Sequence, residues 1–543
     1  MNGIPRLTFL LSVTVLATLT THAGGQEKFR SHEDLLLSAL NLTGQADGNW
    51  AHFRSTSLNT AKLNEQSPWY PYVHRSWKRW KIGEASLGFS EAGFSYAYNS
   101  ALPSSSYDDA PWKGVGSNLR ADLGFELDWK GLRIVIEGNF WYAQNRDFEL
   151  VPAYDGRSED HHYWAFRGGS IDRPQQFIGA HLLRYNLGQT ALRYTSKYFT
   201  VGLSTENIWV GPARFFPLMF SNQGEGFPHA DIGTPGFVPL VLDGIDFGSI
   251  EFRALLGVLY ESDSFDDDQS NNYNQILGFT AGYALPFQKN LTLGLHFYRR
   301  KNMLNFPSNF TQLFDFTNGG PTNTHIDKVD SQVSVTLNWA FPEVGVAVYG
   351  EYGRNDLALP HAAYTRIDHS NGYTLGMQKV FTLKKEQLLS ITAELTDLFQ
   401  IPYNGASQPS WYKHFDVPQG HTHNGQDLGN PVGPGSDSQI LRIDYFNKGA
   451  MYSLWFQRVL MDKDYLYHLT ELHDITPPHP DPPYLKNRHP YYPYALLIIG
   501  TEYSQLMEKW KYYLKIEAQL HYNYGWWAKN DIANIRLELG MSL

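Results

Sequence analysis

The 543-residue chain contains no cysteine. Structural disulfides, thiolate zinc sites, cysteine nucleophiles and a lipid-modified N-terminal cysteine are therefore excluded. Blocks of basic residues are also missing: the densest cluster is Arg299-Arg300-Lys301, and the net charge is −10. Without a basic track for phosphates, we do not expect the chain to bind nucleic acid.

Long apolar runs are equally scarce. The main one extends from Leu7 to Leu19, after Arg6 and before the small residues that end at Ala23. This arrangement predicts a secretory signal peptide over residues 1–23, and the run is too short for a membrane-spanning helix. No later run approaches the roughly 20 apolar residues that such a helix needs, so helical spans are not expected.

Aromatic residues are abundant, at 15% of the chain, and two-residue alternation is the main pattern. Over residues 119–142, two runs of about eleven residues flank the turn Lys130-Gly131, and apolar residues alternate with mostly polar ones. A tilted strand of this length can cross a bilayer, whereas the strands of soluble proteins are usually about 5–6 residues long. The polar row holds Asp122, Glu126, Asp128 and Glu137 beside Arg120 and Arg133, which predicts ion pairs in a barrel lumen.

The same rhythm continues to the end of the chain, with short turns alternating with long loops. The expected strands are residues 82–98, 119–129, 132–142, 177–186, 191–204, 237–242, 250–261, 275–285, 291–300, 332–339, 344–352, 372–381, 388–398, 439–446, 451–459, 494–503, 511–523 and 532–543. This pattern predicts an all-β fold: a transmembrane antiparallel barrel of about eighteen strands over residues 81–543, with long extracellular loops. A soluble propeller or sandwich is the alternative fold.

Residues 24–80 have no clear periodicity. Ser31 precedes a leucine-rich stretch, and Asp34 lies three residues on, which predicts the capped start of a short helix. We expect a small N-terminal periplasmic segment here, packed against the barrel. The localisation expected for the whole chain is the outer membrane of a Gram-negative-type bacterium, after export.

A Gly-, Pro- and aromatic-rich loop lies between residues 205 and 235. It contains Trp209-x-Gly211-Pro212, Ser221-Asn222 and Gly226-Phe227-Pro228-His229. Upstream are Tyr98-Asn99-Ser100 and Trp112-Lys113-Gly114-x-Gly116, and downstream is Gly420-His421-Thr422-His423-x-Gly425. Together these motifs resemble the signature of the Wzi-like capsule assembly proteins. The family motif residues expected to be structural are Gly211, Pro212, Gly226, Pro228, Asn99, Trp112, Gly114 and Gly116.

The resemblance implies an eighteen-stranded outer-membrane barrel whose loops occlude its mouth, with a role in holding capsular polysaccharide at the cell surface. A polysaccharide-binding site needs aromatic faces for sugar rings and polar groups for hydroxyls. The candidate residues are Trp209, Asn222, Phe227, His229, Trp411, Tyr412, His421 and His423. Packing between loops is the alternative role for each of them. The expected partners are capsular or extracellular polysaccharide, outer-membrane lipid and lipopolysaccharide, and the barrel-insertion machinery during biogenesis.

No chemistry is expected. The chain has no G-x-S-x-G nucleophile elbow. His421-Thr422-His423 and Asp266-Asp267-Asp268 lack the ligand number or spacing of known metal sites, so neither a metal nor another cofactor is expected. The sequence therefore predicts a non-enzymatic protein that binds or anchors surface polysaccharide. A porin or channel for sugars or other small solutes is the alternative, and a barrel hydrolase is a third, weaker interpretation.

Overall fold

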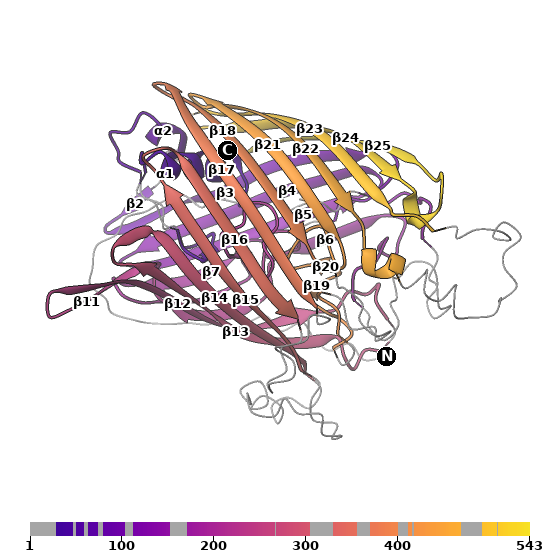
Figure 1. Ribbon diagram of the computed structural model, residues 1–543, viewed down its shortest axis with the longest axis horizontal. Helices are drawn as coiled ribbons and strands as arrows, with labels where there is room; N and C mark the ends of the chain where they lie inside the picture. Colours follow the sequence, from indigo (N-terminus) through magenta and orange to yellow (C-terminus); the bar gives the residue numbers. More distant parts are fainter. Residues whose placement is uncertain are drawn as a thin grey trace, which may run out of the picture.

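The computed structural model describes residues 29–46, 50–58, 63–73, 80–103, 112–151, 171–266, 268–303, 329–355, 370–399, 411–414, 417–467, 491–507 and 509–542. The expected signal peptide lies outside these residues. Most of the described chain forms one closed antiparallel barrel of eighteen tilted strands (Figure 1). The predicted fold class is confirmed. Within the described ranges, no helix has the length and apolar character needed to cross a membrane.

The barrel closes where the last strand pairs with the first, from Arg536 opposite Asn99 to Ser542 opposite Gly93. The barrel segments are β3 (Ala85–Asn99), β4 (Gly116–Trp129), β5 (Leu132–Ala143), β6 (Leu182–Asn186), β7 (Ala191–Thr195), β8 (Thr200–Ser204), β10 (His229–Gly233), β11 (Val238–Leu242), β12 (Ile245–Tyr260), β13 (Tyr273–Leu285), β14 (Gln288–Asn302), β15 (Val329–Phe341), β16 (Val346–Asn355), β17 (Asn371–Lys384), β18 (Gln387–Asp397), β21 (Asp437–Asn447), β22 (Ala450–Leu460), β23 (Ala495–Leu506), β24 (Lys511–Tyr522) and β25 (Ile532–Ser542). Two wall strands are each made of two segments, β6 with β7 and β10 with β11.

The remaining elements are short. They are α1 (His32–Leu42), β1 (Phe53–Ser55), α2 (Tyr70–Val73), β2 (Trp80–Ile82), β9 (Ile208–Val210), β19 (Thr422–His423), β20 (Gln426–Asp427) and the 3₁₀ turn η3 (Tyr524–Trp526). In Figure 1, α1, α2 and β2 lie toward one end of the barrel, and β19 and β20 lie toward the other.

The β4–β5 hairpin has the expected geometry. Its turn residues Lys130 and Gly131 both have positive φ, at 47° and 84°, which suits the right-handed twist of the flanking strands. Apolar side chains such as Phe125 and Ile136 are exposed on the outer face, whereas Glu126 is buried inside. The predicted lumen ion pairs form: Arg133 lies 2.7 Å from Glu126, and Arg120 lies 2.7 Å from Asp122. An apolar exterior around a polar interior is the pattern of an outer-membrane barrel.

One predicted hairpin is wrong. Residues 177–186 and 191–204 were expected to be two strands joined near Gly188. Instead, β6 and β7 are parts of one strand that pairs with β5 throughout. At the bulge between them, the Thr190 hydroxyl donates to Glu137 O and accepts from Glu137 N–H, in place of a backbone ladder contact. The true turn is at Ser196–Phe199, where Ser196 N–H donates to Phe199 O. The strand count is unchanged because the predicted strand 191–204 divides at this turn: its first part, β7, continues β6, and its second part, β8, is a separate wall strand.

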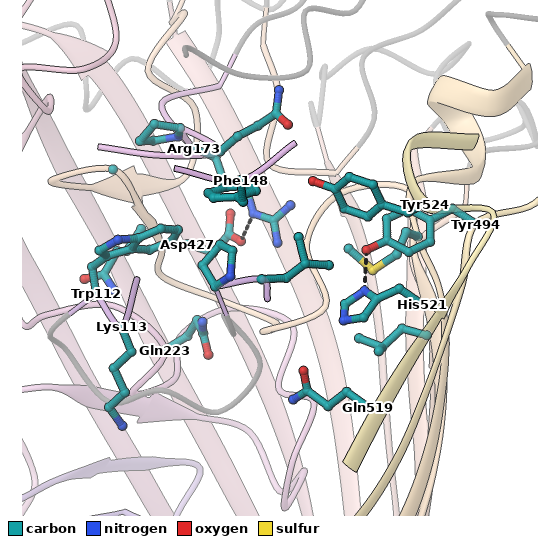
Figure 2. Close-up of a pocket in the computed structure, with 18 residues that line it drawn as sticks. Trp112, Lys113, Phe148, Arg173, Gln223, Asp427, Tyr494, Gln519, His521 and Tyr524 are labelled. Carbon is teal, nitrogen blue, oxygen red and sulfur yellow. Dashed lines mark hydrogen bonds and ion pairs between the residues drawn. The ribbon is translucent and has the colours of Figure 1, made fainter. Parts of the chain in front are cut away.

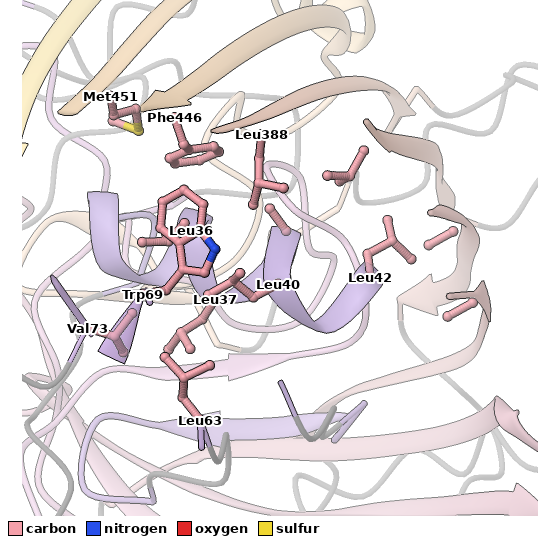
Figure 3. Close-up of a cluster of buried hydrophobic side chains, with 14 residues drawn as sticks. Leu36, Leu37, Leu40, Leu42, Leu63, Trp69, Val73, Leu388, Phe446 and Met451 are labelled. Atoms are coloured by element: carbon pink, nitrogen blue, oxygen red, sulfur yellow. The ribbon is translucent and has the colours of Figure 1, made fainter. Parts of the chain in front are cut away.

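Helix α1 packs at the short-turn end of the barrel (Figure 3). Ser31 is its N-cap and accepts a hydrogen bond from Asp34 N–H, as predicted. Leu36, Leu37 and Leu40 pack with Trp69 and with buried side chains at the ends of several wall strands, namely Ala340, Ala347, Val380, Leu388, Phe446 and Met451. Burial of this apolar face holds the helix against the inside of the wall.

Residues 50–58 reach further along the lumen. The His52 ring contacts the hydroxyls of Thr292 and Thr336 on the inner wall, and β1 pairs with β9. Glu251 on β12 accepts the backbone N–H groups of His52 and Phe53. The described part of the expected periplasmic segment therefore contacts inward-facing residues of the barrel.

Candidate functional site

The central feature of the lumen is the loop of residues 205–228 between β8 and β10, named here the plug segment. It reaches across to β16 and β18, where two buried glutamates accept its backbone N–H groups. Glu351 accepts from Ala213 at 3.0 Å and from Leu218 at 2.8 Å. Glu394 accepts from Arg214 at 2.8 Å, Phe215 at 3.0 Å and Phe216 at 2.6 Å. Since a buried N–H without an acceptor is unfavourable, these carboxylates fix the path of the plug segment.

The plug segment is also attached near its start. Glu206 accepts hydrogen bonds from Ser57 and Thr56 of the N-terminal segment, and it pairs with Arg193 of β7 at 3.0 Å. Arg193 pairs at 2.7 Å with Asp231 on β10 as well. The charges of Glu206 and Asp231 thus offset that of a fully buried guanidinium, which would otherwise be strongly unfavourable.

All eight candidate sugar-binding residues are 7% exposed or less. Trp209 donates its ring N–H to Ala213 O at 3.0 Å, and Phe227 packs beneath Gly257. The His229 ring lies 2.7 Å from Phe227 O through Nδ1 and accepts from the Ser204 hydroxyl through Nε2 at 2.9 Å. These residues hold the plug segment together, and a direct contact of any of them with a sugar stays a prediction.

A second group comes from the loop between β18 and β21. The Tyr412 hydroxyl donates to Leu218 O at 2.8 Å, and its ring stacks on His421 with centroids 5.3 Å apart. Trp411 packs edge-on to Tyr412. His421 Nε2 lies 2.5 Å from Met219 O, and Nδ1 accepts from the Arg300 guanidinium. The sequence motifs around Trp209 and His421 are therefore brought together in one packed plug.

The two loop histidines, His421 and His423, make different contacts. Burial and the nearby Arg300 charge hold the pKa of His421 well below its usual range. Burial lowers the pKa of His423 to about 3, and its Nδ1 accepts from Tyr260 N–H at 2.9 Å. Both rings are therefore neutral at physiological pH, and each is used in a contact of its own.

The family-motif glycines occupy tight positions. Gly211 has φ 99°, and a Cβ there would lie 2.1 Å from Glu351 Oε1. A Cβ on Gly226 would lie 2.1 Å from Thr205 O. Gly116 has φ 95°, and Gly114 faces Asn145 at 3.0 Å. Only glycine combines positive φ with such close approach.

The remaining motif residues also make contacts that fix loops. Asn99 donates to Lys113 O at 2.9 Å and Gly114 O at 3.1 Å, and Trp112 donates to Asn145 at 3.4 Å. Pro228 O accepts from Val258 N–H at 2.9 Å, and Pro212 is buried in the plug segment. Each of these contacts joins a motif residue to a neighbouring segment, and the structural role expected for the motif stays a prediction.

Glu351, Glu394 and Glu251 are functional residues that the sequence analysis missed. Each lies on the inner row of a predicted strand, and an isolated glutamate in such a row was the available signal. Its partners could not be inferred, because they are backbone groups of loops whose path no periodicity reveals.

A large cavity of about 1050 Å³ lies between the plug segment, β5, β6 and the β19–β20 turn. Five predicted site and motif residues line it: Trp112, Asn222, Gly226, Pro228 and His423. Its other walls carry aromatic rings, side-chain amides and a few charges, namely Trp141, Phe177, Tyr260, Tyr273, Asn139, Asn186, Gln189, Asn207, Asn272, Asn424, Gln426, Arg120, Arg184, Glu225, Glu261 and Asp263. Such walls can stack on rings and exchange hydrogen bonds with hydroxyls.

A smaller pocket of about 100 Å³ adjoins it near Trp112 and Gln426 (Figure 2). Arg173 pairs with Asp427 at 2.7 Å on one side, and the Tyr494 hydroxyl lies 2.6 Å from His521 Nδ1 on the other. At about a tenth of the volume of the larger cavity, this pocket is too small for a sugar chain, so the larger cavity is the better candidate site.

No protein-family model and no curated protein matches the chain. Among solved structures, the chain is similar to Wzi of Escherichia coli, an outer-membrane protein involved in group 1 capsule assembly and described as a carbohydrate-binding β-barrel. The TM-score is 0.53 at 11% identity, over 83% of this chain and 84% of that one. OpdK of Pseudomonas aeruginosa matches with TM-score 0.38 and 10% identity over 85% and 100% of the two chains. OprB of Pseudomonas putida matches with TM-score 0.36 and 11% identity over 84% and 93%.

At these identities the likeness concerns the fold. The closed barrel, with its apolar exterior and polar interior, places the chain in the outer membrane of a Gram-negative-type bacterium, as expected. The resemblance to the Wzi-like family in particular stays a prediction.

Proposed function

We propose that this chain is a non-enzymatic outer-membrane protein that binds and anchors capsular or other surface polysaccharide. The observation that supports this most directly is the 1050 Å³ cavity with aromatic and amide walls. Its size is at the upper end of the roughly 300–1,000 Å³ common for ligand sites. Its aromatic, amide and charged walls suit hydroxyl-rich sugar rings, with or without charged substituents, better than purely apolar molecules.

The accessible part of the cavity wall supports the same ligand class. Gln189, Asn207, Asn424 and Gln426 are half-buried and line the cavity. Hydrogen bonds from Gln189 to Asn207, from Asn207 to Gly224 O and from Asn424 to Glu225 hold three of these amides in place at its surface. Tyr260 and Tyr273 pack edge to face at 5.6 Å and present ring surface beside those amides. Amides can serve sugar hydroxyls both as donors and as acceptors, while a tyrosine face covers the apolar side of a sugar ring.

Anchoring a long polymer does not require one tight site. If the cavity and neighbouring loops each hold one repeat weakly, the polymer is retained by avidity. The plug segment serves this function by filling the lumen and giving the cavity a fixed inner wall.

The test is retention of purified protein on immobilised capsular polysaccharide, with capsule attachment in a deletion strain as the cellular readout. Tyr273→Ala should weaken retention about three- to tenfold, since an aromatic contact contributes roughly 0.5–1.5 kcal/mol. Tyr352→Ala is the control, because Tyr352 is exposed on the outer face of β16, away from the cavity. No retention of the parent protein, together with a normally attached capsule in the deletion strain, would contradict the proposal.

A channel for small polar solutes is the second candidate, and one observation favours it. A cavity of about 170 Å³ near the start of α1 shares Phe29, Arg120 and Asn222 with the large cavity. Asn222 also donates to Phe29 O at 3.3 Å, so these residues separate two adjoining spaces that a channel would have to connect. Planar-bilayer recording separates the functions: steady large currents unaffected by polysaccharide would favour the channel, and negligible current would favour the anchor.

A further inference from the structure

The barrel wall is incomplete at the loop end between β6 and β12. β6 pairs with β5 from Asn139 opposite Asn186 to Ala143 opposite Leu182, and among the described strands nothing pairs with its other edge. The next two wall strands, β8 and β10, are five residues long at this point, and their pairing stops at Ser204 opposite His229. On the far side, β10 pairs with β12 only as far as Gly257.

The large cavity extends through this break. Leu183, Tyr185 and Leu187 point out of the barrel and are 79%, 55% and 48% exposed, yet they line the cavity together with inward-facing Arg184 and Asn186. The cavity therefore reaches around the edge of β6.

The other side of the break shows the same arrangement. Tyr273 is 55% exposed at the start of β13, and its neighbour across the strands, Tyr260, lies at the end of β12. Both line the cavity. Because outward-facing residues from both sides belong to its wall, the cavity opens sideways through the barrel, and we name this break the side opening.

Side-chain hydrogen bonds bridge the side opening. Among the described residues, no backbone hydrogen-bond ladder crosses it. Asn186 of β6 donates to Glu225 Oε2 at 2.7 Å, and Asn424 donates to Glu225 Oε1. The β19 turn is in turn held to the end of β12, where Asn424 N–H donates to Tyr260 O at 2.8 Å. Three side chains can move apart by rotamer changes, whereas separating paired strands would break several backbone hydrogen bonds at once.

We propose that the side opening admits an acidic glycolipid, with its sugar headgroup in the cavity and its acyl chains outside, along Leu183, Tyr185 and Leu187. This inference rests on the proposed function and specifies its ligand as the membrane-anchored, lipid-bearing form. Leu183 and Leu187 are on the outer face, where an outer-membrane barrel meets acyl chains, and the same cavity continues to polar and aromatic side chains inside the wall. One molecule with both an acyl part and a sugar part matches the two ends of this cavity.

Arg184 explains the acidic part of the headgroup. Its guanidinium lies 5.1 Å from the Phe177 ring centroid and 5.9 Å from that of Trp141, so two rings fix its position in the cavity wall. Across the described part of the chain it has no ion-pair partner within 4 Å, and the charge that acts on it from farther away is that of Glu225, which is already bonded to Asn186 and Asn424. A phosphate or carboxylate on the headgroup would supply such a partner, since guanidinium binds such groups through paired N–H donors.

The absence of cysteine allows a clean test. In the double variant Asn186→Cys/Asn424→Cys, a short bis-methanethiosulfonate reagent would link the two sides of the side opening, and a reductant would release them. The probes are purified lipopolysaccharide in detergent and the deacylated oligosaccharide prepared from it. We expect the unlinked protein to bind lipopolysaccharide at least tenfold more tightly than the oligosaccharide. Linking should weaken lipopolysaccharide binding at least tenfold, and reduction should restore it in the same sample.

A second experiment does not depend on the linked variant folding. Leu183→Cys is labelled with a maleimide benzophenone, and the matched control is Leu441→Cys, an outward-facing leucine on β21 that is 47% exposed. With one equivalent of lipopolysaccharide, photolysis should cross-link it at position 183 and give only background at 441. Cross-linking at both positions alike would overturn the inference.

The binding comparison also separates the two proposals. Equal affinity for lipopolysaccharide and its deacylated oligosaccharide would overturn the side opening as a lipid site while leaving the polysaccharide function intact. Failure of both probes and of capsular polysaccharide to bind would overturn both.

Discussion

Replacing Glu394 by alanine should loosen the plug segment while the barrel stays folded. Glu394 accepts three consecutive backbone N–H groups, from Arg214, Phe215 and Phe216, and it also accepts from the Tyr349 hydroxyl at 2.6 Å. The carboxylate is 3% exposed, so water does not readily replace it. The barrel ladder through β18 does not involve this side chain and should persist.

The magnitude follows from the stranded donors. A buried N–H left without an acceptor costs about 1–3 kcal/mol, so three of them bound the loss between about 3 and 9 kcal/mol. Water can enter the space left by the deleted side chain, which favours the lower end. A local loss of about 3 kcal/mol corresponds to roughly a 100-fold larger open population. Glu394→Gln should have a smaller effect, since its remaining oxygen can still accept from Phe215 and Phe216.

Hydrogen–deuterium exchange of the refolded protein in detergent measures this directly. The amides of residues 213–218 should exchange about 100-fold faster in Glu394→Ala, less so in Glu394→Gln, and strand amides should be unchanged. Glu517→Ala is the control: Glu517 is a buried glutamate of β24 whose described partners are Lys515, Gln519 and Arg536, outside the plug segment. Unchanged exchange in Glu394→Ala would refute the view that the inner-wall carboxylates hold the plug.

Two further predictions concern the same plug. Gly211→Ala places a methyl group 2.1 Å from Glu351 Oε1 at φ 99°, so it should raise hydrogen–deuterium exchange over residues 209–218 and increase the planar-bilayer current. Gly244→Ala is the control: it lies in an open turn with no atom within 4 Å and should leave both measurements unchanged. Burial lowers the pKa of both His52 and His423 to about 3. A locally opened state that exposes these rings therefore binds more protons than the packed state between about pH 3 and 6.5. The packed state loses stability as the pH decreases through this window. At pH 5 this costs about 2 kcal/mol for each histidine, which exchange over residues 421–424 at pH 5 and 7.5, corrected for intrinsic rates, would detect.

The strands could be predicted from sequence because their signal is local. Along β4 and β5, alternate residues meet lipid or lumen, and the period of two is visible in a single chain. The signal failed between β6 and β8. Gly188 does adopt positive φ, but in a bulge, whereas the real turn at Ser196 carries no glycine and is held by the Ser196 hydroxyl, which accepts from Phe199 N–H at 3.1 Å.

The residues that gather at the candidate site could be predicted from the sequence, but the role of each residue there could not. The candidate residues do converge: Trp209 belongs to the plug segment, and Tyr412 and His421 pack against it. Aromatic and histidine side chains suit both sugar contact and core packing, and only burial separates the two uses. The cavity wall is made instead by ordinary amides such as Asn207 and Gln426, which nothing in the sequence marks out. Glu351 and Glu394 were hidden for a different reason, since their partners lie more than a hundred residues away along the chain.

The plug segment and the side opening have one structural origin. The chain leaves the wall after Ser204 and returns at His229, so the wall strands there are short, and the residues that would have extended them fill the lumen. The junction is tightly packed: Gly226 has no room for a Cβ beside Thr205 O, and a Cβ on Gly257 would lie 2.7 Å from the Phe227 ring. Displacing the plug would therefore break the paired junction. A ligand that enters sideways needs to move side-chain contacts such as the Glu225 bridge and the Ile178–Ser264 hydrogen bond, so the site can be loaded while the lumen stays filled.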